Sequence, residues 1–332
     1  MTLPIPKATD EIINSFKHLL AKRDSVPFDE YIQWALYDER IGYYTAMRQR
    51  IGKTQECDFY TSSSIRPLWG ELIVEACLNL LATRNPNKFT FIEIAAEPND
   101  TVLKGIKLPF RNHQIIRLSD EVNIPDHAVV YSNEWLDAQP FKRFRYSGTE
   151  NGWQEIHISI DGGTFYEIGK PIVGKSSYEL PSNPNRGDLF DWPCGARKSL
   201  NNLLSANSWQ GLFLTFDYGL PREVLLNDRP LGTARAYYKQ SMETNLLLRP
   251  TEQDLTCHLC WDDLQDCLAE NNFHDTGLKT QESFFLHFAS KRVRRAFDEK
   301  KESHNAEMQA IKEIIHPAHL GHGLQAFWGL RM

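Results

Sequence analysis

The sequence predicts an α/β fold in which a mostly parallel β-sheet carries helices on both faces. Segments with the apolar periodicity of helices alternate with short apolar runs that are typical of buried strands. One such run, Val129 to Ser132, ends abruptly in Asn133-Glu134, which is how strands end at the ligand side of a parallel sheet. Two stretches at about 161–195 and 220–262 have few signals of regular structure, so we expect irregular insertions there.

The composition is that of a soluble globular protein. The 332 residues are 41 % hydrophobic and 24 % charged, with a formal net charge of −6. That balance indicates neither a nucleic-acid partner nor an anionic membrane, and no apolar run is long enough to span a bilayer. The N-terminal residues lack the apolar core of a signal peptide, and six cysteines in so long a chain do not form a disulfide framework. We therefore expect a cytoplasmic location.

The first part of the chain is predicted to be helical. Apolar residues recur at helical spacing in three stretches, 10–21, 28–37 and 67–81. Between the second and third stretches lie Tyr43-Tyr44, a basic and flexible piece containing Arg48, Arg50 and Lys53, and the hydroxyl-rich loop 58–64. We assign residues 1–85 to an N-terminal helical cap with a substrate or cofactor loop, and residues 86–332 to the core.

The remaining elements follow from the same patterns. Buried strands are expected at 89–95, 114–118, 127–132 and 211–216, with further strands at 277–281 and 324–330. Alternation of apolar and polar residues predicts antiparallel strands at 142–146 and 152–160. Helices are expected at 99–106, 196–206, 261–270 and 282–295, and then an exposed, charged helix as far as Glu313.

Two carboxylates follow the strand at 127–132. If residues 135–138 form a helical turn, Glu134 and Asp137 lie on one face of it and offer two acceptors to a ligand. The alternative is an ordinary helix N-terminus, capped by Asn133 or Ser132 and favoured by the helix dipole. Spacing alone favours the cap.

Eight motifs in order resemble one family. They are Gly42-Tyr43-Tyr44, Asp58-Phe59-Tyr60-Thr61, Asn133-Glu134-x-x-Asp137-Ala138-x-Pro140, Trp153-x-Glu155, Asp217-Tyr218-Gly219, Gly232-Thr233-x-Arg235, Asp254-x-Thr256-x-His258 and Thr280-Gln281. The set resembles the MidA-like class I methyltransferases, the group that contains the mitochondrial complex I assembly factor that methylates an arginine. The resemblance runs from about Pro27 to the C-terminus.

The resemblance implies a fold, a cofactor and an acceptor. The fold would be a Rossmann-like, seven-stranded sheet with lid insertions, and the cofactor S-adenosylmethionine. The acceptor would be a protein side chain of the arginine type, and a homodimer is an open alternative. Because a guanidinium is protonated at neutral pH, it needs carboxylates to bind it and to accept its proton. Glu134 and Asp137 would do so, while Asn133 orients the nucleophile.

The resemblance also assigns the other candidate positions. Those on the cofactor side are Glu93, Ala95, Glu97, Asp58, Phe59, Tyr60, Thr61 and Asp120. Those on the substrate or lid side are Glu155, Asp217, Tyr218, Arg235, Asp254 and His258. For Asp217-Tyr218-Gly219 a simple turn at a strand end is an equal alternative.

Two departures from the family pattern keep a second function open. Where the family has Glu-x-Gly-x-Gly-x-Gly, this chain has Glu93-Ile94-Ala95-Ala96-Glu97-Pro98-Asn99. Only one strand is expected between Glu93 and Asn133, so one strand–helix unit is shortened or missing. The alternative function is a methyltransferase fold that has lost cofactor binding and acts as an assembly or scaffold protein.

A third function, more remote, would use a metal. Cys257, His258 and Cys260 form a Cys-x-x-Cys with an adjacent histidine, but buried structural cysteines are the favoured interpretation. We therefore predict no metal ligand.

Overall fold

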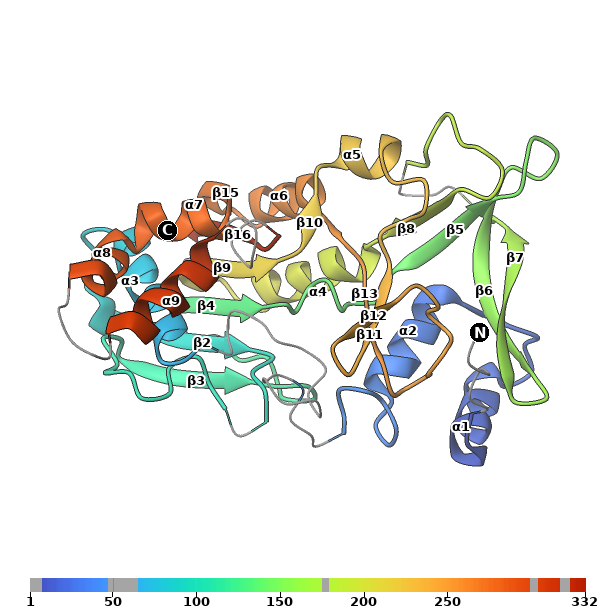
Figure 1. Cartoon of the computed structure of the whole chain (residues 1–332), viewed down its shortest axis with the longest axis horizontal. Helices are drawn as coiled ribbons and strands as arrows, with labels where there is room; N and C mark the ends of the chain where they lie inside the picture. Colours follow the sequence, from blue (N-terminus) through green and yellow to red (C-terminus); the bar gives the residue numbers. More distant parts are fainter. Residues whose placement is uncertain are drawn as a thin grey trace. The chain divides into compact units, whose positions relative to one another are not determined.

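The computed structural model describes residues 8–46, 50, 65–98, 100–174, 179–298, 304–316 and 323–332 (Figure 1). The described chain forms two compact units that interleave in sequence. Unit 1 contains residues 1–47, 136–199 and 220–264, and unit 2 contains residues 48–135, 200–219 and 265–332. Among the described helices, none combines the length and the apolarity needed to cross a bilayer.

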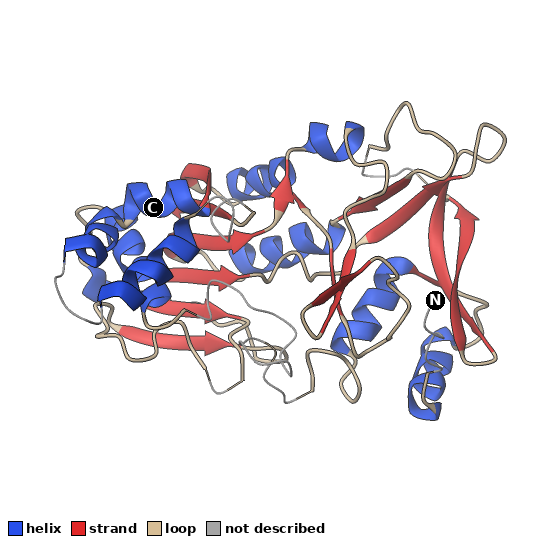
Figure 2. Ribbon diagram, in the orientation of Figure 1, coloured by secondary structure: helices blue, strands red, loops and turns tan. Residues whose placement is uncertain are grey.

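Unit 2 is built on a mixed sheet in which the central strands run parallel (Figure 2). Its strands are Thr90–Ile94 (β2), Asn112–Ile116 (β3), His127–Asn133 (β4), Gln210–Asp217 (β9), His274–Thr280 (β15) and Gln325–Arg331 (β16). Their order is β15-β16-β9-β4-β2-β3, and the last four of these are mutually parallel. The predicted mostly parallel α/β fold is confirmed, and each strand lies within a few residues of its expected position.

The sheet of unit 2 has six strands among the described residues, one fewer than the family resemblance implies. The difference lies between β3 and β4, where residues 117–126 contain no helix. Only ten residues separate the two strands, which is too short for a further strand with its crossover helix. The predicted loss of one strand–helix unit in this interval is therefore confirmed for the described chain.

Helices cover one face of this sheet with a single apolar core. They are Leu68–Leu81 (α3), Gln281–Phe288 (α7), Ser290–Asp298 (α8) and His304–Ile315 (α9). Alternate residues of β9 and β16, such as Leu214 and Trp328, join that core. The intervening residues point to the opposite face, where the Arg331 guanidinium lies 4.9 Å from the ring centroids of both Trp209 and Phe273. Burial on both faces explains why β9 reads as a continuous apolar run.

Unit 1 contains a second, antiparallel sheet. Its strands are Val26–Pro27 (β1), Lys142–Tyr146 (β5), Trp153–Asp161 (β6), Thr164–Pro171 (β7) and Leu189–Trp192 (β8). The helices Asp10–Leu20 (α1) and Phe28–Tyr37 (α2) bring Phe16 and Trp34 into contact with Phe165 of β7. The expected antiparallel pairing of 142–146 with 152–160 is confirmed by β5 and β6.

The rest of unit 1 is a small sheet with short helices. Arg235–Tyr238 (β11) pairs with Ser241–Glu243 (β12) and Asp254–Thr256 (β13). Arg222–Asn227 (α5) and Leu259–Cys260 (β14) also belong to unit 1, while Cys194–Ser205 (α4), Gly219–Leu220 (β10) and Trp261–Glu270 (α6) each contain residues of both units.

Four expectations are wrong. Residues 161–195 are not wholly irregular, because they supply β7 and β8, and residues 220–262 supply α5 and four short strands. Residues 100–106 form turns and not a helix. The expected helix at 282–295 is divided into α7 and α8. No helical turn forms at 135–138, so neither the two-acceptor helix nor the N-cap describes that corner.

Candidate functional site

The chain reverses its direction of sheet growth at β2. From β2 it moves to β3 on one side and then returns to place β4 on the other side. In open parallel sheets, ligands bind beyond the carboxyl ends of the strands at such a switch point. Ile94 pairs with Ser132, so the carboxyl ends that meet there begin with Ala95 and Asn133.

The end of β4 carries the two leading sequence candidates. Glu134 has φ of 47°, a left-handed conformation that is uncommon for a residue with a side chain. Its N–H donates to the carbonyl of Phe216 at 2.8 Å, which fixes this conformation against the neighbouring strand β9. Asn133 Nδ2 donates to Glu134 Oε1 at 2.9 Å, and this contact orients the amide because only its NH₂ group can donate.

Asn133 also presents an acceptor. Its Oδ1 is buried and has no hydrogen-bond partner among the described residues. A buried carbonyl oxygen without a donor carries a desolvation cost, so such atoms are usually satisfied by a ligand or water. Asn133 and Glu134 together therefore present a neutral acceptor and a carboxylate at the switch point.

Asp217 holds the ends of β4 and β9 together. Its carboxylate is fully buried and accepts from the N–H of Trp135 at 3.2 Å and from the N–H of Tyr218 at 2.9 Å. The carboxylate fixes the backbone just after β4 and just after β9, and we regard it as a positioning group for Glu134.

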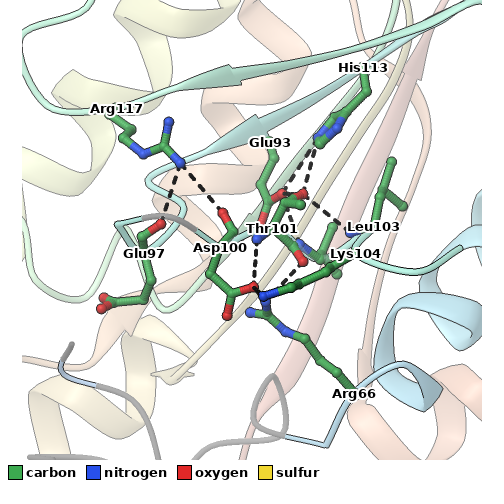
Figure 3. A network of polar contacts seen from close by, with 10 residues as sticks. Arg66, Glu93, Glu97, Asp100, Thr101, Leu103, Lys104, His113 and Arg117 are labelled. Carbon is green, nitrogen blue, oxygen red and sulfur yellow. Dashed lines mark hydrogen bonds and ion pairs between the residues drawn. The ribbon is translucent and has the colours of Figure 1, made fainter.

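Glu93, next to the last residue of β2, is a buried carboxylate that binds the loop following this strand (Figure 3). Both Glu93 oxygens accept from the N–H of Val102 at 3.0 Å, and Oε2 also accepts from the Thr101 hydroxyl at 2.5 Å. These contacts direct the Glu93 carboxylate toward residues 101–102 of its own loop. Glu93 therefore fixes the conformation of the loop.

Three arginines hold the same loop from outside. Arg66 pairs with the Asp100 carboxylate and donates to the carbonyl of Thr101, and Arg117 reaches the carbonyls of Glu97 and Asp100 at 3.4 Å (Figure 3). Arg50, which is only 2 % exposed, lies with Nη1 3.8 Å from Glu97 Oε2. Its backbone N–H donates to the same oxygen at 3.2 Å. The expectation that Arg50 belongs to a flexible basic piece is wrong.

At Ala95 the loop keeps the backbone conformation that glycine favours, although the glycines of the family pattern are replaced. Ala95 has φ of 58°, which is the left-handed conformation that glycine adopts without strain. Ala95 is also exposed. Glu97 is largely buried; burial raises the pKa of its carboxyl, and the neighbouring positive charge of Arg50 opposes that rise.

Asp120 lies beyond the carboxyl end of β3, in an exposed turn. Its Oδ2 accepts from the N–H of Arg117 at 2.8 Å, which closes the turn. Asp120, predicted on the cofactor side, therefore lies in an exposed turn at the carboxyl-end edge of the sheet.

The third member of the predicted catalytic set, Asp137, belongs to unit 1. There it lies with Asp254 close to two partly buried tyrosines of the N-terminal segment. Tyr44 donates to Asp254 Oδ1 at 2.9 Å, Tyr37 donates to the carbonyl of Ala138 at 3.0 Å, and the two rings stack at 5.5 Å. Burial, together with both carboxylates, raises the pKa of each tyrosine, so both hydroxyls stay protonated. We call Tyr37, Tyr44, Asp137 and Asp254 the tyrosine–carboxylate cluster.

Two further lid candidates, Arg235 and His258, lie at the small sheet of unit 1. Arg235 pairs with Thr256 across β11 and β13, and the N–H of His258 donates to the Thr233 hydroxyl at 3.2 Å. Burial and the charges of Arg229 and Arg235 lower the pKa of His258 to about 4, so the imidazole is neutral at neutral pH. Gly232 is needed here because a Cβ atom would lie 2.2 Å from Asp191 Oδ2, which accepts from the N–H of Thr233.

Glu155 lies elsewhere in unit 1, on β6. Its Oε1 accepts from Lys142 Nζ at 2.5 Å, and Lys142 also lies 3.9 Å from Asp29. Glu155 therefore belongs to an ion-pair cluster of the five-stranded sheet and not to the small sheet with Arg235 and His258.

The remaining candidates are residues 58–61 and the two cysteines of the Cys-x-x-Cys motif. Asp58, Phe59, Tyr60 and Thr61 lie outside the described residues. Cys257 and Cys260 are buried free thiols, and within the described ranges no group of three or more histidines, cysteines or acids could hold a metal ion.

Sequence reasoning missed Arg117 and Tyr37 and misjudged Arg50. Arg50 meets Glu97 across 47 positions of sequence, and Tyr37 meets Ala138 across 101. No local pattern signals such contacts. The glutamate and proline in place of glycine were the one available sign that this loop needs an unusual partner.

Comparisons with known proteins agree with this geometry. The model of a family described as “Putative S-adenosyl-L-methionine-dependent methyltransferase” matches residues 74–279. A crystal structure of a superfamily member from Burkholderia thailandensis, bound to S-adenosyl-homocysteine, has 20 % sequence identity and a TM-score of 0.82, with 99 % of this chain and 95 % of that chain covered. A native structure from the same organism gives 19 % identity and a TM-score of 0.79 at the same coverage. A search of curated proteins finds no match.

Proposed function

The chain belongs to the S-adenosyl-L-methionine-dependent methyltransferase family whose model matches it, and from that premise we propose that it methylates an arginine-type side chain of a protein. The observation that carries the proposal is the Asn133–Glu134 pair at the switch point of the unit 2 sheet. Glu134 would bind the protonated guanidinium and accept the proton that it loses, since a carboxylate matches the geometry and charge of that group.

Two features of the described residues fit S-adenosylmethionine at this edge. Ala95 supplies a left-handed, exposed turn after β2. Arg50 compensates the charge of Glu97, which would otherwise face the carboxylate of the cofactor. The cofactor, when bound, supplies an electrophilic methyl group on sulfur.

The chain's own residues would position the acceptor nitrogen. Asn133 Oδ1 would accept a hydrogen bond from the guanidinium, and Glu134 Oε2 would take its proton as the nitrogen becomes a nucleophile. Asp217 would keep Glu134 in place through the N–H of Trp135. Such positioning is the main protein contribution to an in-line displacement.

One observation favours a second function. All three glycines of the family's cofactor loop are replaced, and arginines hold the replacing loop. A fold that has lost cofactor binding and serves as an assembly or scaffold protein would have the same features.

Two measurements separate these functions. Calorimetry with S-adenosylmethionine should give saturable binding, whereas a folded protein that shows none at millimolar cofactor is the scaffold. If the protein binds, incubation with methyl-labelled cofactor and a protein extract, followed by acid hydrolysis, should yield labelled methylarginine. Label in another residue, with cofactor binding intact, would reject the arginine acceptor alone.

We further propose a cytoplasmic location, a protein partner, and no nucleic-acid or membrane partner; a homodimer stays open. The net charge of −6 and the free thiols of the described cysteines support these assignments. Size-exclusion chromatography with light scattering would decide the oligomeric state.

A further inference from the structure

The Thr101 hydroxyl lies between a carboxylate and an imidazole in unit 2 (Figure 3). Its Oγ1 is 2.5 Å from Glu93 Oε2 and 3.3 Å from His113 Nε2. His113 Nε2 is also 3.6 Å from the same Glu93 oxygen. Polar groups from β2, from β3 and from the loop between them therefore meet at one point. We call them the Glu93–Thr101–His113 chain.

The direction of each hydrogen bond in this chain follows from the hydrogens that are available. A carboxylate only accepts, so the single hydroxyl hydrogen of Thr101 is donated to Glu93. The Thr101 oxygen therefore accepts from His113, whose Nε2 must carry a hydrogen. The same oxygen accepts from the N–H of Leu103 at 3.3 Å, which uses its second lone pair. A donor at the position of His113 Nε2 is thus needed to complete the chain.

Glu93 depends strongly on the Thr101 hydroxyl. The Glu93 carboxylate is 6 % exposed, and its described donors are this hydroxyl and the N–H of Val102, both of them neutral. Within the described ranges, His113 is the one basic side chain with a nitrogen within 4 Å of Glu93. A buried carboxylate that loses a donor is destabilised, because water does not replace it. Loss of the hydroxyl would therefore weaken the hold of Glu93 on Val102.

The strand β3 contacts both ends of the loop that runs from Ala95 to Val102. At the start of the loop, the N–H of Ala95 donates to the carbonyl of Ile116 at 2.9 Å. At its end, His113 contacts Thr101, the neighbour of Val102. β3 is the terminal strand of the described sheet, so no further described strand supports these contacts. The path of the loop between its two ends is therefore set from β2 and β3.

We propose that His113 is a positioning residue for S-adenosylmethionine, which acts on the loop after β2 through Thr101 and Glu93. No covalent step and no proton transfer is involved. This role rests on the proposed function, because the loop follows β2 at the switch point that we assign to the cofactor. Without the chain, the loop would populate other conformations, and the affinity falls in proportion to the fraction that stays competent to bind.

Variants that remove and restore each donor test this role by calorimetry with S-adenosyl-homocysteine. Thr101→Val removes the hydroxyl and should weaken binding by about ten- to a hundredfold, whereas Thr101→Ser keeps the hydroxyl and should bind as the wild type does. His113→Phe has no donor and should weaken binding by about three- to tenfold. His113→Gln places an N–H near the position of Nε2, so its affinity should stay within about twofold of the wild type.

The two variants of His113 also separate a donor from a packing residue. The imidazole packs against the Phe91 ring, with 5.9 Å between the ring centroids. His113→Phe keeps a ring for this contact and loses the donor, whereas His113→Gln loses the ring and keeps a donor. If His113 only packed, His113→Phe would bind normally and His113→Gln would bind weakly, which is the opposite of our expectation.

A double variant tests whether His113 acts through Thr101. If it does, Thr101→Val combined with His113→Phe should bind S-adenosyl-homocysteine as Thr101→Val alone does, because the acceptor of the histidine is already gone. If the two losses multiply, His113 acts independently of Thr101 and the proposal is wrong.

Amide hydrogen exchange of the ligand-free protein locates the change. The N–H of Val102, which Glu93 accepts, should exchange faster in Thr101→Val and His113→Phe than in the wild type. His127→Phe is the matched control, because His127 begins β4 at the opposite end of the sheet and also packs against a phenylalanine, Phe89, at 5.7 Å. It should leave S-adenosyl-homocysteine binding and Val102 exchange unchanged.

The outcomes are distinct. Binding by the wild type together with normal binding by His113→Phe, or with unchanged exchange at Val102, overturns this role and leaves the proposed function standing. A folded wild type that does not bind overturns both. Far-ultraviolet circular dichroism checks the fold of each variant. Should Thr101→Val not fold, His113→Phe and His113→Gln decide the question, since the His113 side chain is 21 % exposed.

Discussion

The ends of β2 and β4 are neighbours in one sheet, and both turn through a left-handed residue that is not glycine. At β4 the residue is Glu134, with φ of 47°, and its own side chain is the functional group, held by Asn133. At β2 the residue is Ala95, with φ of 58°, and the functional groups lie further along the loop, held by arginines. The backbone path of a ligand-binding turn can therefore persist when its glycines are gone.

The two ends differ in how their carboxylates are compensated. Glu134 accepts from the neutral amide of Asn133, whereas Glu97 lies against a buried arginine and burial raises the pKa of its carboxyl. A strained residue persists only where its surroundings hold it, and in each case a neighbouring strand or arginine does so. The comparison predicts that changes at the β4 end affect chemistry and changes at the β2 end affect cofactor binding.

The largest effect is expected at Glu134. Glu134→Gln keeps the size of the side chain but removes the proton acceptor, so methyl transfer should fall by about 10²- to 10⁴-fold with cofactor affinity unchanged. Single-turnover transfer and calorimetry measure the two quantities separately. Glu121→Gln, on the exposed loop after β3, is the control and should leave transfer intact. Normal transfer by Glu134→Gln would remove Glu134 from the mechanism.

The second-largest effect expected is a loss of stability in the variant Asp217→Asn. The buried carboxylate accepts from two backbone N–H groups, and an amide in its place offers one oxygen and two unwanted donors. We expect a loss of about 1–3 kcal/mol in the free energy of unfolding, measured by urea denaturation. Asp120→Asn, in an exposed turn, should cost less than about 0.5 kcal/mol. Equal losses would show that Asp217 does not hold the strand ends.

The pH dependence of cofactor binding should report the ionisation of Glu97, in the loop that follows β2. As the pH falls toward the raised pKa of Glu97, that carboxyl becomes neutral and no longer repels the carboxylate of the cofactor, which stays ionised. Affinity for S-adenosyl-homocysteine should therefore rise on mild acidification. The other charged groups that act on Glu97 are Asp100 and Arg66. In Glu97→Gln the rise should disappear; a rise of the same size there would assign it to another group.

The smallest effect is expected at Ala95. Ala95→Gly relieves the strain of a positive φ and should stabilise the protein by about 0.5–1 kcal/mol, despite the greater freedom of glycine in the unfolded chain. Ala96, the next residue, has no positive φ, so Ala96→Gly should destabilise by a similar amount. Thermal unfolding of both variants measures the difference, and destabilisation by both would show that Ala95 is not strained.

The sequence alone determined the sheet and the end of β4. β2, β4 and β9 were found because strands buried on both faces must be apolar throughout, and a polar residue after such a run marks its end. The same reasoning located Asn133 and Glu134, and the shortened interval from Glu93 to Asn133 predicted the missing strand–helix unit. These features are local in sequence, so a pattern of neighbouring residues can report them.

Tertiary structure decided everything that depends on distant partners. The turn at 134–138 is not helical because β9 supplies the carbonyl of Phe216 and the carboxylate of Asp217, which bind the N–H groups of Glu134 and Trp135. β7 escaped detection because residues on both of its faces are partly exposed, which leaves no apolar alternation. Arg50 reads as one more surface cation until the fold buries it against Glu97. Its burial depends on a charge 47 positions away, and only the folded chain brings the two together.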